Sequence, residues 1–262
     1  MSKERRFTFD EVAELYDKHR PGYPSALFDD LISLARLKPR SRLLEIGCGT
    51  GKATLPLAQR GHSLVCLEPG SDLARVATRH LPPDANVEIL PATFEDWPLE
   101  TEAFDLVFSA QAFHWVPPEI SFPKAAAALK PGGALAVFGN AVLPTSSPLR
   151  DAIDDVYCHH APSLPGPLAT RWYAQGGAVE SLFEASGCFG RPRVRRYPRT
   201  RRYSASEYSA LLETHSDHRT LPPNTRETLL AEVRCAIEAH GGSLEIAYET
   251  SLYLAAQAAA CT

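Results

Sequence analysis

The fold is decided by the stretch Leu43-Leu44-Glu45-Ile46-Gly47-Cys48-Gly49-Thr50-Gly51-Lys52-Ala53. An apolar run that leads into three alternating glycines and then a helical pattern predicts a strand, a tight turn and the start of a helix. Glycines let a ligand approach the backbone, and the first turn of a helix offers N–H groups without intrahelical partners. Lys52 stands where the dinucleotide fingerprint needs a glycine, and Ala53 stands where the phosphate loop needs Ser or Thr. The stretch therefore predicts a ligand-binding loop of another kind.

Strands and helices alternate around this loop. Short β-branched or leucine-rich runs predict strands at residues 42–46, 63–67, 87–90, 104–109 and 134–138. Helical patterns lie between them, at residues 53–60, 71–80 and 122–129. Strands this short, separated by helices, predict right-handed βαβ units in a parallel sheet that is buried on both faces. The fold class is therefore α/β.

Two glutamates near the loop indicate the ligand. Glu68 ends the second predicted strand, where an acidic side chain can accept hydrogen bonds from the two hydroxyls of a ribose. Glu45 lies inside an apolar strand and needs a partner there, such as a ligand ammonium or a backbone N–H. The expected ligand is a nucleoside, with no requirement for a pyrophosphate.

With these features the sequence resembles the class I S-adenosylmethionine-dependent methyltransferases. The resemblance covers about residues 40–138 and rests on four motifs: Glu45-Ile46-Gly47-Cys48-Gly49-Thr50-Gly51, Glu68, Phe104-Asp105-Leu106-Val107 and Leu129-Lys130-Pro131-Gly132-Gly133. It implies S-adenosyl-L-methionine as cofactor and S-adenosyl-L-homocysteine as product. It also implies a Rossmann-like, seven-stranded mixed sheet of order 3-2-1-4-5-7-6 with helices on both faces. The last strand would be antiparallel, and residues 191–202 and 244–254 would be the sixth and seventh strands.

Within this class, the chain is similar to small-molecule enzymes of the trans-aconitate methyltransferase type. The residues that carry this likeness are Tyr16 with Arg20-Pro21-Gly22-Tyr23-Pro24, and Ser109-Ala110-Gln111-Ala112-Phe113-His114-Trp115. The likeness implies that the segment before the sheet folds over the cofactor, with Arg20 or Tyr16 near the methionine carboxylate. The competing interpretation makes Tyr16 an anchor of the N-terminal helix and Arg20 a surface charge. Thr93 replaces the usual Asp or Ser, so the adenine contact is expected from the Phe94 backbone and Glu95.

The resemblance divides the chain into three parts. Residues 1–40 are expected to form an N-terminal helical lid, and residues 41–140 the cofactor-binding core. Residues 141–262 are expected to supply a cap insertion, a small helical cap, and the two closing strands of the same domain.

The expected site has a cofactor half and an acceptor half. The cofactor-binding residues are expected to be Tyr16, Arg20, Glu45, Gly47, Cys48, Gly49, Glu68, Pro69, Thr93, Phe94, Glu95 and Gln111. The acceptor pocket is expected to use Tyr23, Trp115, Trp172, Tyr173 and His218. His114 and His215 are the candidate catalytic groups, as a base or as a donor to a carboxylate. The competing interpretation of His114 is a histidine packed among aromatic side chains.

Composition and spacing exclude other classes. The 262 residues hold 27 Lys plus Arg and 31 Asp plus Glu, so a net charge of −4 gives no general reason to expect a nucleic acid. Seven arginines between residues 191 and 202 are interpreted as a solvated strand face. Cys158-His159-His160 has no second Cys/His pair nearby, so no metal is expected. No signal peptide or membrane span is expected. The six cysteines are scattered without CxxC spacing, as reduced thiols would be, and this favours a cytoplasmic protein.

The sequence therefore predicts a methyltransferase that acts on a small carboxylate or hydroxyl acceptor by in-line transfer. A catalytically silent ligand-binding protein on the same fold stays open, as does a nicotinamide-dependent oxidoreductase, which Lys52 disfavours. The oligomeric state, monomer or homodimer, is not readable from the sequence.

Overall fold

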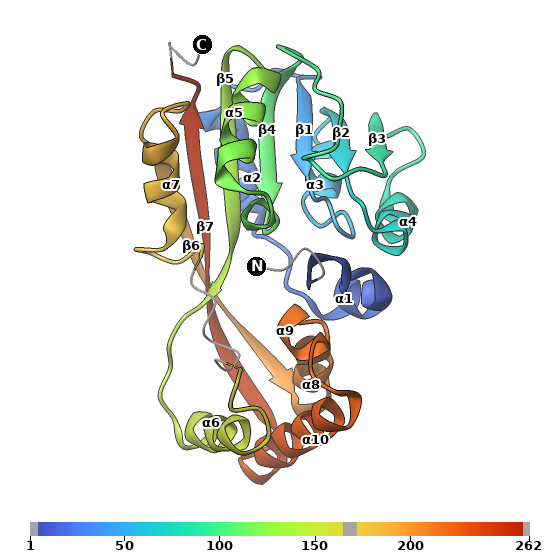
Figure 1. Cartoon of the computed structure of the whole chain (residues 1–262), viewed down its shortest axis with the longest axis vertical. Helices are drawn as coiled ribbons and strands as arrows, with labels where there is room; N and C mark the ends of the chain where they lie inside the picture. Colours follow the sequence, from blue (N-terminus) through green and yellow to red (C-terminus); the bar gives the residue numbers. More distant parts are fainter. Residues whose placement is uncertain (1–4, 165–171, 259–262) are drawn as a thin grey trace. The chain divides into compact units, whose positions relative to one another are not determined.

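The computed structural model describes residues 5–164 and 172–258. Seven strands form one sheet of order β3-β2-β1-β4-β5-β7-β6 (Figure 1). Their bounds are β1 Arg42–Ile46, β2 Ser63–Leu67, β3 Val87–Leu90, β4 Phe104–Ala110, β5 Leu129–Val142, β6 Arg193–Ser204 and β7 Ser243–Ala256. The expected mixed sheet and its strand order are confirmed.

The helices are α1 Ala13–His19, α2 Ser25–Leu34, α3 Thr54–Ala58, α4 Ser71–His80, α5 Pro118–Ala128, α6 Pro148–His160, α7 Ala178–Ser186, α8 Ala205–Glu213, α9 Ser216–Arg219 and α10 Pro223–Ala239. Short 3-10 turns cover Arg5–Phe7, Asp10–Val12 and Phe113–Trp115. Among the described residues, no helix is long and apolar enough to cross a membrane.

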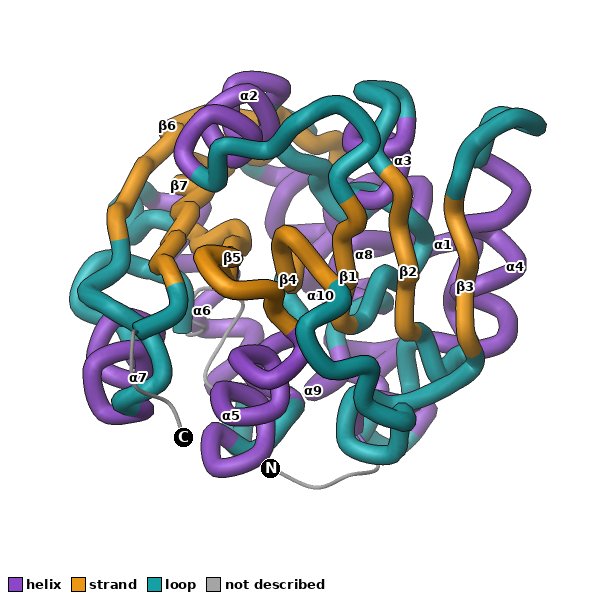
Figure 2. The backbone as a smooth tube through the Cα atoms, turned by 90° about the horizontal axis from the view of Figure 1, so that it is seen from above, coloured by secondary structure: helices purple, strands orange, loops and turns teal. Residues whose placement is uncertain are grey.

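The first five strands run parallel, as the βαβ pattern predicts. In β1, Leu44 pairs with Val65 of β2 and with Val107 of β4, which puts β1 at the middle of this part of the sheet. Because side chains alternate along a strand, each face of the sheet carries its own apolar cluster. One face packs against α2 and α3, and the other against α5 and α7 (Figure 2).

The structure adds one element to the predicted set and corrects the bounds of others. The segment 141–178, part of the expected cap insertion, contains α6, whose start is set by Pro148 and by the Ser147 side chain that accepts from the Arg150 N–H. The fifth strand begins at Leu129, where Phe104 of β4 pairs with it, and it is much longer than the predicted 134–138. The two closing strands also extend beyond their predicted bounds.

The chain forms two compact units. The first comprises residues 1–21, 141–171 and 198–249, and the second residues 22–140, 172–197 and 250–262. The second unit holds the two apolar clusters on the faces of the sheet. The first unit has its own core, built from α6, α8 and α10 together with the adjoining parts of β6 and β7. The long strands β5, β6 and β7 contribute residues to both units.

Candidate functional site

The glycine loop follows β1 in the second unit and makes a tight turn. The backbone N–H groups of Gly47 and Cys48 both donate to the Leu67 carbonyl, at 2.9 and 3.2 Å. Gly47 has φ +70°, and a Cβ added there would lie 2.5 Å from the Cβ of Ala112. Gly49 has φ +56°, but nothing lies within 4 Å of its Cβ position. The loop therefore requires glycine at both positions, and its Gly49 side is open to a ligand.

Glu68 joins the end of β2 to this loop. One carboxylate oxygen accepts from the Gly49 N–H at 2.8 Å, and the other accepts from the Gly70 N–H at 2.9 Å. A carboxylate has about four acceptor positions, so a carboxylate that holds the loop in this way can also accept from the hydroxyls of a ribose. Glu68 is only 6% exposed, and a buried carboxylate is stable only when hydrogen-bond donors surround it.

Glu45 lies beneath the loop and is fully buried. The Thr54 hydroxyl donates to Oε2 at 2.6 Å, and Cys66 Sγ lies 3.7 Å from the same oxygen. Within the described part of the chain, the buried Oε1 has no hydrogen-bond partner. Burial raises the pKa of Glu45 to about 7, against the opposing effect of the Thr54 bond. A buried acceptor without a partner fits a ligand that brings a donor, so the residues present fit an aminoacyl nucleoside.

Cys48 completes the buried group of polar side chains under the loop. Its hydrogen bond with Cys66, together with burial, raises the pKa of Cys48 well above the usual value. Both thiols are therefore neutral, and Cys48 has a packing role in this structure. Pro69, expected beside the cofactor, is exposed directly after Glu68.

The expected adenine loop follows β3 and has a defined internal structure. The Thr93 hydroxyl donates to Asp96 at 2.7 Å, so its side chain caps the turn. Phe94 is buried and stacks on Trp97, with 6.2 Å between ring centroids. Lys124 donates to the carbonyls of Glu95 and Trp97, and burial lowers the pKa of Lys124. The Phe94 ring is thus a core side chain, which leaves the backbone and Glu95 as the groups for the predicted adenine contact.

Three residues of the expected acceptor pocket, Trp115, Trp172 and Tyr173, lie around the candidate catalytic residue His114, which follows β4. His114 Nδ1 and the Tyr173 hydroxyl share a hydrogen bond of 3.1 Å. The ring centroids of Trp115, Trp172 and Tyr173 lie 4.8, 5.5 and 5.8 Å from that of His114. His114, Trp115 and Trp172 are half-buried, whereas Tyr173 is buried against Gly139. The structure therefore holds one imidazole in a fixed orientation among three aromatic rings.

Gln111 directly follows β4 in a strained backbone conformation that sequence patterns do not show. Its φ is +60°, in the left-handed region. Its side-chain amide donates to the Asn140 carbonyl and accepts from the Asn140 N–H, both at 3.4 Å. The Asn140 side chain accepts from the Thr250 hydroxyl at 2.6 Å and donates to the Gly22 carbonyl at 3.3 Å. Asn140 and Thr250 are further functional candidates, which no local sequence motif marks. A strained backbone held by such a network is typical of ligand sites.

The other expected site residues lie elsewhere. Tyr23 packs edge-on against Phe28 and Phe138, with 6.5 and 5.0 Å between ring centroids, on the opposite face of the sheet from Tyr173. Tyr16 packs against Phe9 at 5.8 Å, and the Arg20 guanidinium lies 5.3 Å from the centre of the Tyr16 ring. Both belong to the first unit, and their role at the cofactor stays a prediction.

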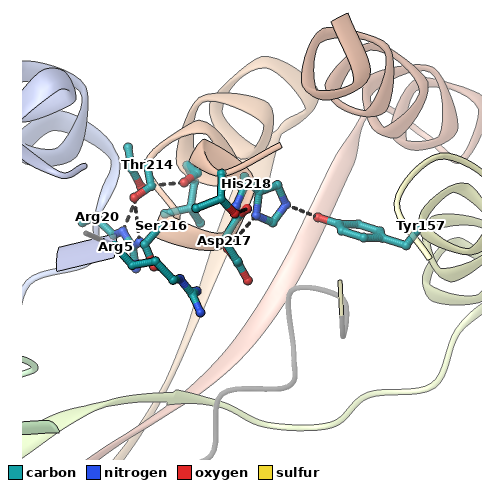
Figure 3. Close-up of polar contacts among 9 residues, drawn as sticks. Arg5, Arg20, Tyr157, Thr214, Ser216, Asp217 and His218 are labelled. Carbon is teal, nitrogen blue, oxygen red and sulfur yellow. Dashed lines mark hydrogen bonds and ion pairs between the residues drawn. The ribbon is translucent and has the colours of Figure 1, made fainter. Parts of the chain in front are cut away.

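Arg20 and the two remaining histidines meet partners within the first unit (Figure 3). Arg20 donates to the Thr214 hydroxyl at 2.8 Å and to the Thr214 carbonyl at 3.0 Å. His218 is fully buried and shares a 2.6 Å hydrogen bond with the Tyr157 hydroxyl. Burial, with the nearby Arg20 cation, lowers the pKa of His215 well below its usual value, so its imidazole is neutral at neutral pH. The predicted catalytic role of His215 is likewise untested by this arrangement.

The sheet order and the glycine loop followed by Glu68 define a class I methyltransferase fold. Residues 44–137 match the family model described as a methyltransferase domain. An uncharacterized methyltransferase of Mycobacterium bovis is 34% identical over 138 residues, which cover 53% of this chain and 54% of that protein. The chain thus spans about half the length of the curated relatives that it matches first.

Solved structures show the same fold. A candidate type II methyltransferase from Anaeromyxobacter dehalogenans has a TM-score of 0.57 at 22% identity, covering 90% of this chain and 97% of that one. A phosphoethanolamine N-methyltransferase of Haemonchus contortus, in complex with phosphomonomethylethanolamine and S-adenosylhomocysteine, has a TM-score of 0.53 at 17% identity. The match covers 94% of this chain and 57% of the Haemonchus contortus chain. At these identities, the likeness concerns the fold.

Proposed function

We propose that this protein is an S-adenosylmethionine-dependent methyltransferase that acts on a small molecule. The observation that carries the proposal is the loop around Gly49, with Glu68 on its backbone and, beneath it, the Oε1 atom of Glu45, which has no hydrogen-bond partner among the described residues. The solved Haemonchus contortus enzyme of the same fold holds S-adenosylhomocysteine and a small acceptor, which supports the proposal.

The cofactor would be held by residues of the second unit. The open Gly49 side of the loop would accept the aminoacyl part, and Glu68 would accept hydrogen bonds from the ribose hydroxyls. Glu45 would receive a donor at Oε1, and Glu95 with the backbone of its loop would border the adenine. When bound, the cofactor supplies a methyl group on a sulfonium for an in-line displacement. The chain's own part is to align the acceptor and to exclude water.

His114 is the group proposed to face the acceptor. Tyr173 fixes the imidazole, and the rings of Trp115 and Trp172 provide apolar walls beside it. A carboxylate acceptor, as in enzymes of the trans-aconitate type, would need only a hydrogen-bond donor, whereas a hydroxyl acceptor would need His114 as a base. Neither route requires a metal ion or a nucleic acid. A panel of small carboxylic acids and alcohols, assayed for methyl transfer, would decide the acceptor class.

The cofactor assignment has a direct test. We expect S-adenosylhomocysteine to raise the melting temperature of the purified protein in a dose-dependent way, since a ligand that binds only the folded state stabilises it. Glu68→Ala removes the proposed ribose acceptor and should weaken binding at least tenfold. Glu88→Ala, an exposed glutamate on the neighbouring strand β3, is the matched control and should bind like the wild type.

The unliganded melting temperature of Glu68→Ala shows whether that variant folds. No shift with the wild type, or an equal shift with the folded Glu68→Ala variant, would overturn the proposal. Full binding without methyl transfer to any member of a wide acceptor panel would instead favour a silent ligand-binding protein on this fold.

A further inference from the structure

Three side chains around α9 bring possible metal ligands together in the first unit. His215, Asp217 and His218 each offer one ligand atom, and these atoms lie within 4.8 Å of one another. Asp217 Oδ1 lies 2.8 Å from His218 Nδ1, and the two imidazole centroids are 5.5 Å apart with their planes at 88°. Figure 3 shows Asp217 and His218 side by side, with Tyr157 beyond the imidazole. None of these contacts is used by the proposed methyl transfer.

The spacing of the two rings fits a common ion. In a tetrahedral zinc site with Zn–N bonds of about 2.1 Å, two ligating imidazoles have ring centroids roughly 5 Å apart. The observed 5.5 Å therefore needs only a small adjustment of either ring. The 2.8 Å contact between Asp217 and His218 is shorter than the distance between two ligands of one ion, so the carboxylate would rotate away from the imidazole on binding.

The surroundings of His218 match those of a ligating histidine. A metal-bound imidazole usually gives its second ring nitrogen to a hydrogen-bond partner, which fixes the orientation of the ring. Here Nε2 of His218 lies 2.6 Å from the Tyr157 hydroxyl of α6, which leaves Nδ1 as the ligand atom. His218 is buried, whereas His215 and Asp217 are half-buried. An ion could thus reach the cluster from the side of His215 and Asp217.

Hydrogen bonds from other segments hold the backbone of the cluster in place. Arg20 donates to Thr214, next to His215, and Arg5 donates to the Ser216 hydroxyl at 3.2 Å. The two guanidinium groups disfavour a cation nearby, and this cost is opposed by the Asp217 carboxylate and two imidazole ligands. Two nitrogens and one oxygen are the donor set preferred by borderline ions such as Zn²⁺.

We propose that His215, Asp217 and His218 form a binding site for one divalent ion of the zinc type, which the cofactor site does not include. Three protein ligands would leave one position for water. The ion would link α9 to the residue before it and, through His218 and Tyr157, to α6. In the competing case, Asp217, His218 and Tyr157 form only a hydrogen-bonded connection between α6 and α9.

Isothermal titration of chelator-treated, full-length protein with ZnCl₂ tests the proposal. The titration uses a Cys158→Ser background, because an exposed thiol beside His159 would bind zinc on its own. The expected result is one saturable equivalent of Zn²⁺ and a melting temperature that rises with its concentration. His215→Ala and Asp217→Asn should each lower the affinity at least tenfold. His159→Ala, an exposed histidine of the same unit, should leave it unchanged.

The variants' melting temperatures without zinc show that each is folded. Absence of saturable binding in the Cys158→Ser protein would leave only the hydrogen-bonded connection. A loss of less than tenfold in either His215→Ala or Asp217→Asn, or an equal loss in His159→Ala, would also overturn the proposal. Because the readout is zinc affinity and not methyl transfer, its failure would not bear on the proposed function.

Discussion

At the scale of single residues, Glu45 places an ionisable side chain inside the apolar core. Its carboxyl group is fully buried, and burial raises its pKa from an ordinary value of 4.5 to about 7. Between these two values the unfolded chain releases the proton while the folded protein retains it. The contribution of Glu45 to stability is therefore complete below about pH 4.5 and is lost as the pH rises through about 7.

Glu45→Gln removes this titration at nearly constant volume. From about pH 5 to about pH 8, we expect the free energy of unfolding of the wild type to fall by about 2–3 kcal/mol more than that of the variant. Urea denaturation at the two pH values, without cofactor, measures the difference. Glu88→Gln, on an exposed position of β3, should keep the pH dependence of the wild type. An equal pH dependence in Glu45→Gln and wild type would show that the buried carboxyl does not titrate in this range.

At the scale of elements, α6 illustrates how a local signal starts a helix within an irregular segment. The Ser147 hydroxyl accepts from the Arg150 N–H at 3.1 Å, and Pro148 occupies the first turn, where its missing N–H costs no hydrogen bond. The helix then places Tyr157 against His218 of α9. The cap therefore stabilises an element on which the cluster around His218 depends.

Ser147→Ala should lower the free energy of unfolding by about 1 kcal/mol, because the first turn of α6 loses its side-chain acceptor. Urea denaturation of the variant measures this loss. Ser146→Ala, at the exposed preceding position, is the matched control and should change stability by less than about 0.5 kcal/mol. Equal effects of the two substitutions would mean that the Ser147 hydroxyl does not act as a cap.

At the scale of the whole molecule, the chain builds two compact units with separate apolar cores. The sheet clusters belong to the second unit, while the core of the first unit is formed around residues such as Leu229 and Val233 of α10. Cores that share few residues can open with different free energies. Substitutions in one core are therefore expected to act mainly on its own unit.

Leu229→Ala should lower the free energy of unfolding by about 2–5 kcal/mol, because the side chain is fully buried and its removal leaves a cavity. We expect hydrogen exchange to become faster in α6, α8 and α10 and to change little in β1, β2 and β4. Mass spectrometry of exchanged peptides measures both. Leu135→Ala, equally buried in β5, should give the converse pattern. Faster exchange spread evenly over both units in each variant would show that they open together.

Local sequence features account for much of the fold and for the conformation of the glycine loop. Apolar runs such as 42–46 and 63–67 match their strands, and the glycines after Ile46 adopt the positive φ values that the turn requires. These features depend on neighbours in the sequence, and the resemblance supplied the strand order. Of the residues predicted for the acceptor half, His114 and Tyr173 meet, whereas Tyr23 lies on the other face of the sheet.

The sequence by itself determined the α/β pattern, the glycine loop and the acid that follows it, because backbone conformation and side-chain alternation are encoded over a few residues. Only the tertiary structure decided the contacts between distant positions: Gln111 with Asn140, Arg20 with Thr214, and His218 with Tyr157. Each of these contacts depends on how strands and helices pack, so no local pattern in the sequence predicts the pairing.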